Sequence, residues 1–551
     1  MIGLDFETVG LEPAREKLRL IQTADGDVPN VLDAWASGVD PERALASLAQ
    51  HELVAHNASF EESWMRAYGV ELPEGMHDTM IAWMVLQQAD APSSVHDVLH
   101  SLGHIAKEVL GVELDKEMQT SDWGADKLSD RQLDYAALDA GILGPLFEEL
   151  MRRVEDEGQA FVYDIERRAR PAFDWMTRTG IYVDVPQLRL AMDELKAEFD
   201  EKGEWLQENA PINWGSSKQL IEFFELSKKK GWPKTDGGKP STKMNYLKRL
   251  DHPAIPTYER WKKLKKLFEA YGDGWVGMVD PDGRLRPGWL QFGTETGRVS
   301  CGEPNVQQVP RKGPHRRAMV APTGRVLVVA DYSQIELRIT AKHVGDEPLL
   351  DIFQQGRDVH EEMASAITGK TEISEDERNK AKAANFGLTY GCGIKGFIGI
   401  AEDYNVKLSY EESKKIINTF REMYPSVYAW HQEAYDYKRG EYPETRTMAG
   451  RARRRFNIYT DWLNAPIQGT GADGAKLPLA LLWERRGEVP SAAPVNFIHD
   501  EIVVECDEAD GEKAKAWLET AMIDGMAQVL NQRKPHVPIG VDAKIKTVWG
   551  K

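Results

Sequence analysis

Two apolar segments carry carboxylates where a β-sheet core is expected, and they constrain the fold more than any other feature. The stretch RVLVVADYSQIELRIT reads as one strong strand whose apolar residues run directly up to Asp331. The stretch PVNFIHDEIVVEC has two apolar runs around Asp500 and Glu501, the pattern of a hairpin. A turn position would explain either aspartate by itself. Because a carboxylate beside a sheet core is unfavourable without a cation or partner, the pair indicates a shared metal centre.

A third segment, RNKAKAANFGLTYG, lies between these two in the sequence and predicts a helix with an unusual face. Arg378, Lys382, Phe386 and Tyr390 follow one another at intervals of four residues, so they share one slowly turning helix face. Cations hold triphosphate oxygens through charge-assisted hydrogen bonds, and an aromatic face packs on a base. The order of charges and rings along this helix matches a nucleoside triphosphate.

Carboxylates also recur in the N-terminal part, where strand and helix patterns alternate as in an α/β domain. Asp5 and Glu7 are two apart on a strand and project from one sheet face, and such paired oxygen ligands suit Mg²⁺ or Mn²⁺. Glu61 follows a second short strand, and Tyr135 and Asp139 share a helix face. A lone Asp-x-Glu pair is typical of a solvated sheet edge, whereas the whole set indicates a second metal site.

Composition and length are those of a multidomain globular protein. The 551 residues favour two to four domains, and 42% hydrophobic with 28% charged residues allow sizeable cores. No apolar run approaches about 20 residues and the N-terminus lacks a signal sequence, so neither a membrane span nor secretion is expected. Cys301, Cys392 and Cys506 are far apart and form no metal-type spacing or disulfide framework, which suits a reducing cytoplasm.

The net charge of −19 alone argues against a nucleic-acid partner, but the charge is unevenly placed. Residues 228–266 hold thirteen Lys or Arg against three acids, and the stretch GRARRRF adds a second basic cluster. Solvated surface is the simplest interpretation of either cluster alone. Together they are compatible with a groove that follows a phosphate backbone.

The N-terminal motifs resemble the proofreading exonucleases of the DEDD type, in the variant whose last motif carries tyrosine. The resemblance implies an RNase H-like α/β fold in which Asp5, Glu7, Glu61 and Asp139 bind two divalent ions and Tyr135 orients water at a 3′-terminal phosphodiester. This chain departs from the family at Glu61, where aspartate is usual. The extra methylene leaves the exonuclease rate open, with the neighbouring glutamate, Glu62, as an alternative ligand.

From about residue 160 to the C-terminus, the sequence strongly resembles family A DNA polymerases, the group of bacterial DNA polymerase I and many phage replicases. DYSQIELR and HDEIVVE match the palm motifs, and RNKAKAANFGLTYG matches the fingers motif. TETGRVSCGEPNVQQVP resembles the template-primer segment, and NAPIQGTGAD resembles a further palm segment. All five occur in the order and spacing of the family.

The resemblance implies a two-metal polymerase site that uses Mg²⁺, with Mn²⁺ as a substitute. Asp331 and Asp500 would bridge the ions, and Glu501 would assist nearby. The carbonyl of Tyr332 would complete one coordination sphere, and Lys382 would donate a proton to pyrophosphate. The resemblance implies that six residues contact the incoming nucleotide: Arg378, Phe386, Tyr390, His360, Gln334 and Glu336. Among these, Glu336 would select deoxyribose. The residues implied to contact primer and template are Arg298, Asn305, Gln307, Asn464, Gln468 and His499. For the two histidines, a structural hydrogen-bonding role is the alternative.

The implied architecture is an exonuclease domain over residues 1–155 followed by an α+β right-hand polymerase domain over 156–551. The palm would be an antiparallel sheet from residues of about 286–345 and 441–551. The thumb, over about 186–285, and the fingers, over about 346–440, would both be helical. The basic part of the thumb would grip duplex phosphates without reading sequence.

The implied function is templated DNA synthesis with 3′→5′ proofreading by a cytoplasmic monomer. Its partners would be primer-template DNA and deoxynucleoside triphosphates, and no helicase or processivity-factor site is identifiable. The start of the exonuclease at residue 1 favours a phage replicase. The alternatives are a bacterial-type repair or gap-filling polymerase and an exonuclease whose C-terminal half only binds DNA. Asp331, Lys382 and Asp500 argue against the last of these.

Overall fold

The computed structural model of the protein describes residues 1–550 apart from 27, 37, 73, 91–97, 115–117, 119–120, 236 and 312. By the density of its internal contacts the chain divides into two units. Unit 1 comprises Met1–Thr179, Gly288–Gly302 and Arg325–Ile545. Unit 2 comprises Gly180–Pro287, Glu303–Gly324 and Lys546–Lys551.

The first part of unit 1 is built on a five-stranded sheet in the order β3-β2-β1-β4-β5. Strand β1 (Ile2–Thr8) is antiparallel to β2 (Leu18–Asp25) and parallel to β4 (Leu53–Ala55). The other elements of this part are β3 (Val28–Asp33), β5 (His77–Asp78), α1 (Pro41–Leu48), α2 (Ser59–Ala67), α3 (Thr79–Gln88) and α4 (Leu102–Leu110). The alternation along β1 buries Leu4 and Phe6 in the core, so the acids between and after them project from the opposite face.

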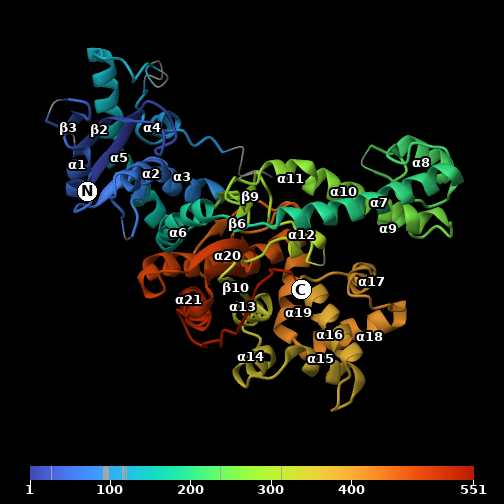
Figure 1. Ribbon diagram of the computed structural model, residues 1–551. Coiled ribbons are helices and arrows are strands. Elements are labelled where there is room, and N and C mark those ends of the chain that lie inside the picture. Colours follow the sequence, from blue (N-terminus) through green and yellow to red (C-terminus); the bar gives the residue numbers. More distant parts are fainter. Residues whose placement is uncertain are drawn as a thin grey trace. The chain divides into compact units, whose positions relative to one another are not determined.

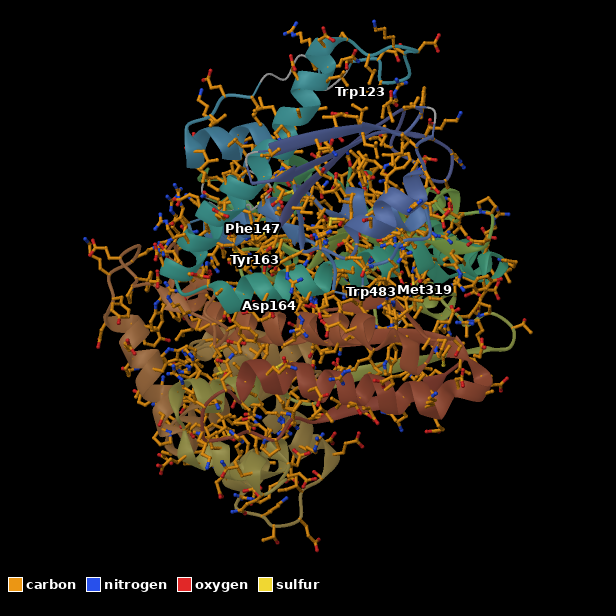
Figure 2. All side chains as sticks on the ribbon, turned by 90° about the vertical axis from the view of Figure 1, so that its left-hand side faces the viewer. Trp123, Phe147, Tyr163, Asp164, Met319 and Trp483 are labelled. Carbon is orange, nitrogen blue, oxygen red and sulfur yellow. The ribbon has the colours of Figure 1, made fainter. Side chains whose placement is uncertain are left out.

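Two long helices follow this sheet. Helix α5 (Asp130–Asp156) begins at a capping box of Ser129 and Gln132 and packs along β1, β2 and β3 (Figure 1). Gly158, with φ of 64°, makes the left-handed turn into α6 (Ala160–Thr179). The rings of Phe147 on α5 and Tyr163 on α6 lie 5.9 Å apart (Figure 2).

The second part of unit 1 contains a four-stranded sheet in the order β13-β14-β10-β15. Strand β14 (Glu501–Asp507) is antiparallel to both β10 (Arg325–Tyr332) and β13 (Ala493–Ile498), as predicted for the hairpin. β15 spans Val541–Lys546. Helix α21 (Gly511–Leu530) packs on β10 and β14 and lies beside α20 (Tyr459–Glu484) (Figure 1). Their apolar side chains share one large core.

The strand predicted over RVLVVADYSQIELRIT is wrong in its second half. β10 ends at Tyr332, and helix α13 (Ile335–Val344) begins three residues later. Gln334 adopts a left-handed conformation with φ of 56°, which turns the chain out of the sheet. The alternating Ile, Leu and Ile of IELRIT fit a strand, but all three are buried equally well by a helix packed on α14, α19 and α20.

The regular elements of residues 346–440, the segment predicted as helical fingers, are all helices. Helix α16 begins at a capping box of Ser374 and Glu377 and ends at Leu388. The helices of this segment are α14 (Glu347–Gln354), α15 (Val359–Thr368), α16 (Glu375–Leu388), α17 (Ile394–Asp403), α18 (Tyr410–Met423) and α19 (Pro425–Asp436). Short strand pairs elsewhere in unit 1 are β8 (Gly288–Leu290) with β9 (Ser300–Gly302) and β11 (Thr445–Arg446) with β12 (Ala452–Arg453).

Unit 2 is helical, and its two longest helices, α7 (Val185–Asn209) and α10 (Ala254–Tyr271), lie side by side (Figure 1). Its other elements are α8 (Ser217–Phe223), α9 (Met244–Leu247), α11 (Asp273–Gly277), α12 (Pro314–Arg317), β6 (Ile181–Tyr182) and β7 (Arg284–Leu285). Trp214, Leu247 and Tyr258 contribute to its core. Throughout the described ranges, no helix has the combined length and apolarity needed to cross a bilayer.

Candidate active sites

A cavity of about 610 Å³ in the first part of unit 1 gathers all the residues predicted for the exonuclease. Strand β1 supplies Asp5 and Glu7, helix α2 supplies Glu61, and helix α5 supplies Tyr135 and Asp139. These residues are up to 134 positions apart in sequence and come from three elements, but the structure brings them to one wall. The tyrosine hydroxyl hydrogen-bonds to the Asp139 carboxylate, as their i and i+4 spacing allows.

The carboxylates of this cavity strongly perturb one another. Burial and then the charge of Asp139 raise the pKa of Asp5 to about 8. Burial, Asp5 and Asp139 raise the pKa of Glu7 to about 9. Burial and then Asp5 raise the pKa of Glu61 well above its ordinary value. Burial also raises the pKa of Asp139 to about 6, against the opposing hydrogen bond from Tyr135. Four such groups favour a bound cation, because a divalent ion removes the repulsion between them.

The donor set fits a hard divalent cation. Glu61 is 2% exposed, and its Oε2 is buried without a hydrogen-bond partner among the described residues. A buried oxygen of this kind is unfavourable unless a cation or donor reaches it. Within the described part of the chain, the acids line a cavity rather than forming a closed group of three or more ligands. The cavity therefore offers oxygen ligands that an ion would draw together.

Three residues form a cluster behind this cavity, and two of them, Asp78 and Arg170, were not identified from the sequence. Glu62 was the alternative ligand, but its Oε1 accepts from the Met76 amide at 2.7 Å and pairs with Arg170. Asp78 pairs with the same guanidinium. Arg170 lies 108 residues from Glu62, so no local pattern announces this cluster. Glu62 is thus engaged away from the cavity, as its position beside Glu61 on a helix suggests, so the structure does not support it as a substitute ligand.

The carboxylates predicted for a polymerase site lie at adjoining strand ends. Asp331 is opposite Glu501 in the β10–β14 register, and the amide of Tyr332 approaches the Asp500 carbonyl at 3.4 Å. Burial, then Asp331 and Glu336, raise the pKa of Asp500 to about 7. His499 takes the left-handed conformation, with φ of 57°, that makes this tight turn. The sheet therefore holds Asp331 and Asp500 as close neighbours through its backbone.

Glu336 joins the strand ends to the end of the fingers helix. It lies in the first turn of α13 and accepts from Arg298 Nη2 at 2.8 Å and from the Tyr390 hydroxyl at 2.7 Å. Tyr390 stands in the turn after α16, two residues beyond the end of the helix at Leu388, so only the first three members of the stripe lie on the helix itself. Because Glu336 also raises the pKa of Asp500, it is electrostatically coupled to the sheet carboxylates.

The cationic half of the stripe is anchored to helix α15. Arg378 donates from Nη2 at 2.6 Å and from Nε at 3.1 Å to Asp358, which was not identified from the sequence. Asp358 is also the N-cap of α15, accepting from the His360 amide at 2.7 Å. Burial and the nearby cations Arg378 and Lys382 lower the pKa of His360 to about 4, against the opposing effect of Asp358.

Phe386 lies in a small cluster of rings on the same face. Its ring centroid is 5.6 Å from that of His360 and 6.4 Å from that of Tyr404, which lies nearly parallel at 9°. Asn385 fixes the imidazole from behind: its Nδ2 donates to the Val359 carbonyl and faces His360 Nδ1 at 3.0 Å. Nδ1 is therefore the acceptor, which leaves the proton on Nε2.

The remaining predicted residues are placed as follows. The Tyr332 hydroxyl donates to the Met522 carbonyl at 2.7 Å, so the side chain is used in packing and the main chain stays at the strand end. Gln334 occupies the turn before α13. Gln468 and Asn464 are neighbours on α20, 3.5 Å apart through their amides. The structure places Asn305 and Gln307 in unit 2.

The basic stretch GRARRRF is largely paired within the protein. Arg451 is buried and bonds to Asp473 and Glu166 and to the amide of Gln88. Arg453 and Arg454 have carboxylate partners as well. Arg451 therefore cannot follow a phosphate backbone, and the suggested contribution of that residue to a groove is wrong.

Comparison with known proteins accounts for both parts of the chain. Residues 186–551 match the model of DNA polymerase family A, and residues 1–155 match a 3′–5′ exonuclease family. The chain belongs to the family A DNA polymerases and carries a 3′–5′ exonuclease domain. The prediction made from the motifs is thus confirmed for family, fold class and enzyme class.

The relatives include several bacterial enzymes named DNA polymerase I. The one from Aquifex aeolicus (strain VF5) is 32% identical over an alignment covering 100% of this chain and 95% of that enzyme. The thermostable DNA polymerase I of Thermus thermophilus is 33% identical, but the alignment covers 73% of this chain and 50% of that enzyme. The fold is similar to that of the POL domain of Pol1 from M. smegmatis, which was solved in complex with DNA primer-template and dNTP. The TM-score is 0.80 and the sequence identity is 23%. The match covers 100% of this chain and 95% of that chain.

Proposed function

We propose that the chain extends a primer 3′ end with deoxynucleoside triphosphates on a DNA template and removes mismatched 3′ nucleotides at the N-terminal cavity. The observation that carries this proposal is the position of Glu336. It couples electrostatically to Asp500 on the sheet and accepts a hydrogen bond from Tyr390 at the end of the cationic helix. This link between the sheet carboxylates and the end of the cationic helix supports the proposal that metal binding and triphosphate binding share one site.

Two Mg²⁺ ions, with Mn²⁺ as a substitute, fit the donors at each site. Asp331, Asp500 and the Tyr332 carbonyl would hold them in the polymerase, assisted by Glu501. The acids Asp5, Glu7, Glu61 and Asp139 would hold them in the exonuclease, with Tyr135 orienting water. Such ions neutralise the charge that develops on the attacking and leaving oxygens.

The chain's own residues would bind and orient the nucleotide. The proposed contacts to the triphosphate are Arg378, Lys382, His360 and Gln334, and Lys382 is the proposed proton donor to pyrophosphate. Phe386 offers a ring face to the base. Glu336, which accepts hydrogen bonds from Arg298 and Tyr390, is the residue proposed to meet a 2′-hydroxyl. Its rigid position supports discrimination against ribonucleotides.

The domain boundaries and DNA contacts follow the same proposal. Residues 1–155 form the exonuclease, with the polymerase over 156–551 divided into thumb, palm and fingers as the motifs suggest. Primer and template would be contacted by Arg298, Asn305, Gln307, Asn464, Gln468 and His499. The helical, lysine-rich unit 2 supports a role in gripping duplex phosphates.

Two biological roles remain in competition. The phage assignment stays a prediction, while the bacterial DNA polymerase I relatives favour a repair or gap-filling role. Extension on a long primed single strand and filling of a short gap would separate them. A repair enzyme should fill the short gap but dissociate often on the long template. A replicase working alone should extend the primer equally well on both substrates.

The function is tested with a labelled primer that ends in a mismatch. Without deoxynucleotides, the primer should shorten from its 3′ end when Mg²⁺ is added. With deoxynucleotides, trimming should be followed by full extension. Failure to extend even a matched primer would overturn the polymerase proposal. Extension without any trimming would show that Glu61 has disabled the exonuclease.

A further inference from the structure

The guanidinium of Arg170 reaches from α6 into the back of the exonuclease part. The residue is 4% exposed. Its Nη1 donates to Asp78 Oδ2 at 3.0 Å, and its Nη2 donates to Glu62 Oε1 and to the Met76 carbonyl, the latter at 3.4 Å. The polymerase reaction proposed above uses none of these groups.

The two carboxylates paired with Arg170 hold the backbone around the start of α2. Asp78 accepts from the amides of Asn57 at 3.1 Å and Ala58 at 2.9 Å, the residues just before the helix. Asn57 is in the left-handed region with φ of 59°, so this hydrogen bond fixes a conformation that is unusual for the residue. Glu62 accepts from the Met76 amide at 2.7 Å, which ties the first turn of α2 to the chain ahead of β5.

Glu61 precedes Glu62 on this same turn and faces the other way, into the exonuclease cavity. The backbone that carries Glu61 is therefore fixed from behind by Glu62 and Asp78. Both of those acids are buried, and breaking a buried ion pair leaves uncompensated charge. Without Arg170, Glu62 and Asp78 would lose their shared cation and the first turn of α2 would lose its anchor.

We propose that Arg170 is a positioning residue of the exonuclease, which holds α2 so that Glu61 is aligned for metal binding. This inference rests on the proposed role of Glu61 as a metal ligand. Arg170 lies between the two segments that match known families, on a helix that also packs against α20 and β13 of the polymerase part. The exonuclease site is thereby anchored to a helix outside the matched exonuclease segment.

The test compares Arg170→Gln with Arg168→Gln in the full chain. Arg168 is on the same helix, but its guanidinium pairs with Glu484 at 2.7 and 3.0 Å, away from the exonuclease. Mn²⁺ binding is measured by electron paramagnetic resonance in proteins that also carry Asp331→Asn and Asp500→Asn, so that only exonuclease ions are counted. Arg170→Gln should weaken Mn²⁺ binding about 10-fold, the lower range for residues that support metal ligands. Arg168→Gln should not change it.

Activity measurements on the single variants complete the test. Arg170→Gln should need about 10-fold more Mg²⁺ for half-maximal trimming while extending a matched primer normally. Arg170→Lys should fall between wild type and Arg170→Gln, because it keeps the charge but loses the two-armed geometry. If Arg170→Gln does not fold, Glu62→Gln, which keeps an acceptor for Met76, should show the same weakening.

Unchanged Mn²⁺ binding in Arg170→Gln, or an equal loss in Arg168→Gln, would overturn the inference. These results differ from a failure of the proposed function. If the wild-type protein trims no primer, and if Asp5→Asn does not reduce its Mn²⁺ binding, the proposed metal site itself is contradicted. If the wild-type protein trims normally and Arg170→Gln trims equally well, only the proposed role of Arg170 is contradicted.

Discussion

In the exonuclease cavity four carboxylates come from β1, α2 and α5, whereas the polymerase acids Asp331 and Asp500 lie at adjoining ends of paired strands. The strand register fixes the polymerase acids, since backbone hydrogen bonds hold β10 against β14. The cavity acids depend instead on how two helices pack against one strand. The exonuclease geometry is therefore the more sensitive of the two to lost side-chain packing.

The two sites also differ in charge. All four cavity acids have raised pKa values, and no cation of this chain is described among the lining residues apart from titratable histidines. At the sheet carboxylates, Arg298 opposes the rise in the pKa of Asp500, and we propose that the separate helix α16 adds Arg378 and Lys382 to the polymerase site. The described lining of the cavity thus holds neither lysine nor arginine, although Arg170 behind it opposes the rise in the pKa of Glu61. At the sheet, a guanidinium opposes the rise in the pKa of Asp500.

The largest expected effects come from removing one acid at each site. Asp500→Ala should lower primer extension by about 10³-fold or more, because several kcal/mol of metal-supplied stabilisation is lost, and should leave trimming intact. Asp5→Ala should do the reverse. Gel assays of both variants on matched and mismatched primers measure the two rates. Loss of both reactions in either variant would contradict the independence of the sites.

A second test concerns the fixed carboxylate at the polymerase site. Glu336→Ala removes the acceptor of both Arg298 and Tyr390 and opens the space proposed for a 2′-hydroxyl. The ratio of kcat/KM for deoxyribonucleotides to that for ribonucleotides should fall about 100-fold. Tyr390→Phe, which removes only one hydrogen bond, serves as the control and should change this ratio less. An unaltered ratio in Glu336→Ala would rule out this residue as the selector.

A third test uses pH to compare the charge of the two sites. The pKa values of about 8 for Asp5 and about 9 for Glu7 are raised above those of the unfolded chain, so their contribution to stability is complete below about pH 4 and is lost as pH rises through 8 and 9. Mg²⁺ competes with these protons, so it should raise the Tm by roughly 5 °C more at pH 9 than at pH 6. Scanning calorimetry measures this difference, and Asp5→Asn should reduce it. A Mg²⁺ effect independent of pH would show that the cavity acids are already ionised.

The smallest expected effect concerns His360. Because its pKa is lowered to about 4, the imidazole is neutral at physiological pH and can offer triphosphate only an uncharged donor from Nε2. His360→Gln should raise the KM for nucleotide about 5-fold, the equivalent of one ordinary hydrogen bond. The effect should be the same at pH 6 and pH 8. A KM that falls on acidification only in wild type would mean that the imidazole acts as a cation.

Local patterns predicted most of both candidate sites. The two-residue spacing of Asp5 and Glu7 and the four-residue spacing of Tyr135 with Asp139 survive in the structure, because a strand or helix fixes such neighbours directly. The stripe survives on α16 as far as Phe386, and Tyr390 falls in the turn after the helix. The IELRIT segment was assigned to the wrong element because its apolar alternation suits both a strand and a packed helix. Only the left-handed turn at Gln334, which no residue type announces, decides between them.

The long-range partners could not be predicted. Arg451 stands in a run of arginines that looks solvated, yet it is buried against acids up to 285 residues away. Arg170 and Asp78 are unremarkable in sequence, and Glu62 was considered only as a ligand. Their cluster exists only because α6 returns to the back of α2. Spacing describes one element at a time, whereas ion pairs between elements depend on how the chain folds back.

The position of Arg170 has a practical meaning for hybrid enzymes. The turn at Gly158 looks like the natural junction for transplanting a proofreading domain, since it follows the end of the matched exonuclease segment. A graft joined there would leave behind the arginine that the incoming Glu62 and Asp78 require. Exchange after Thr179, with the whole of α6 travelling alongside its donor domain, keeps these three side chains from a single parent.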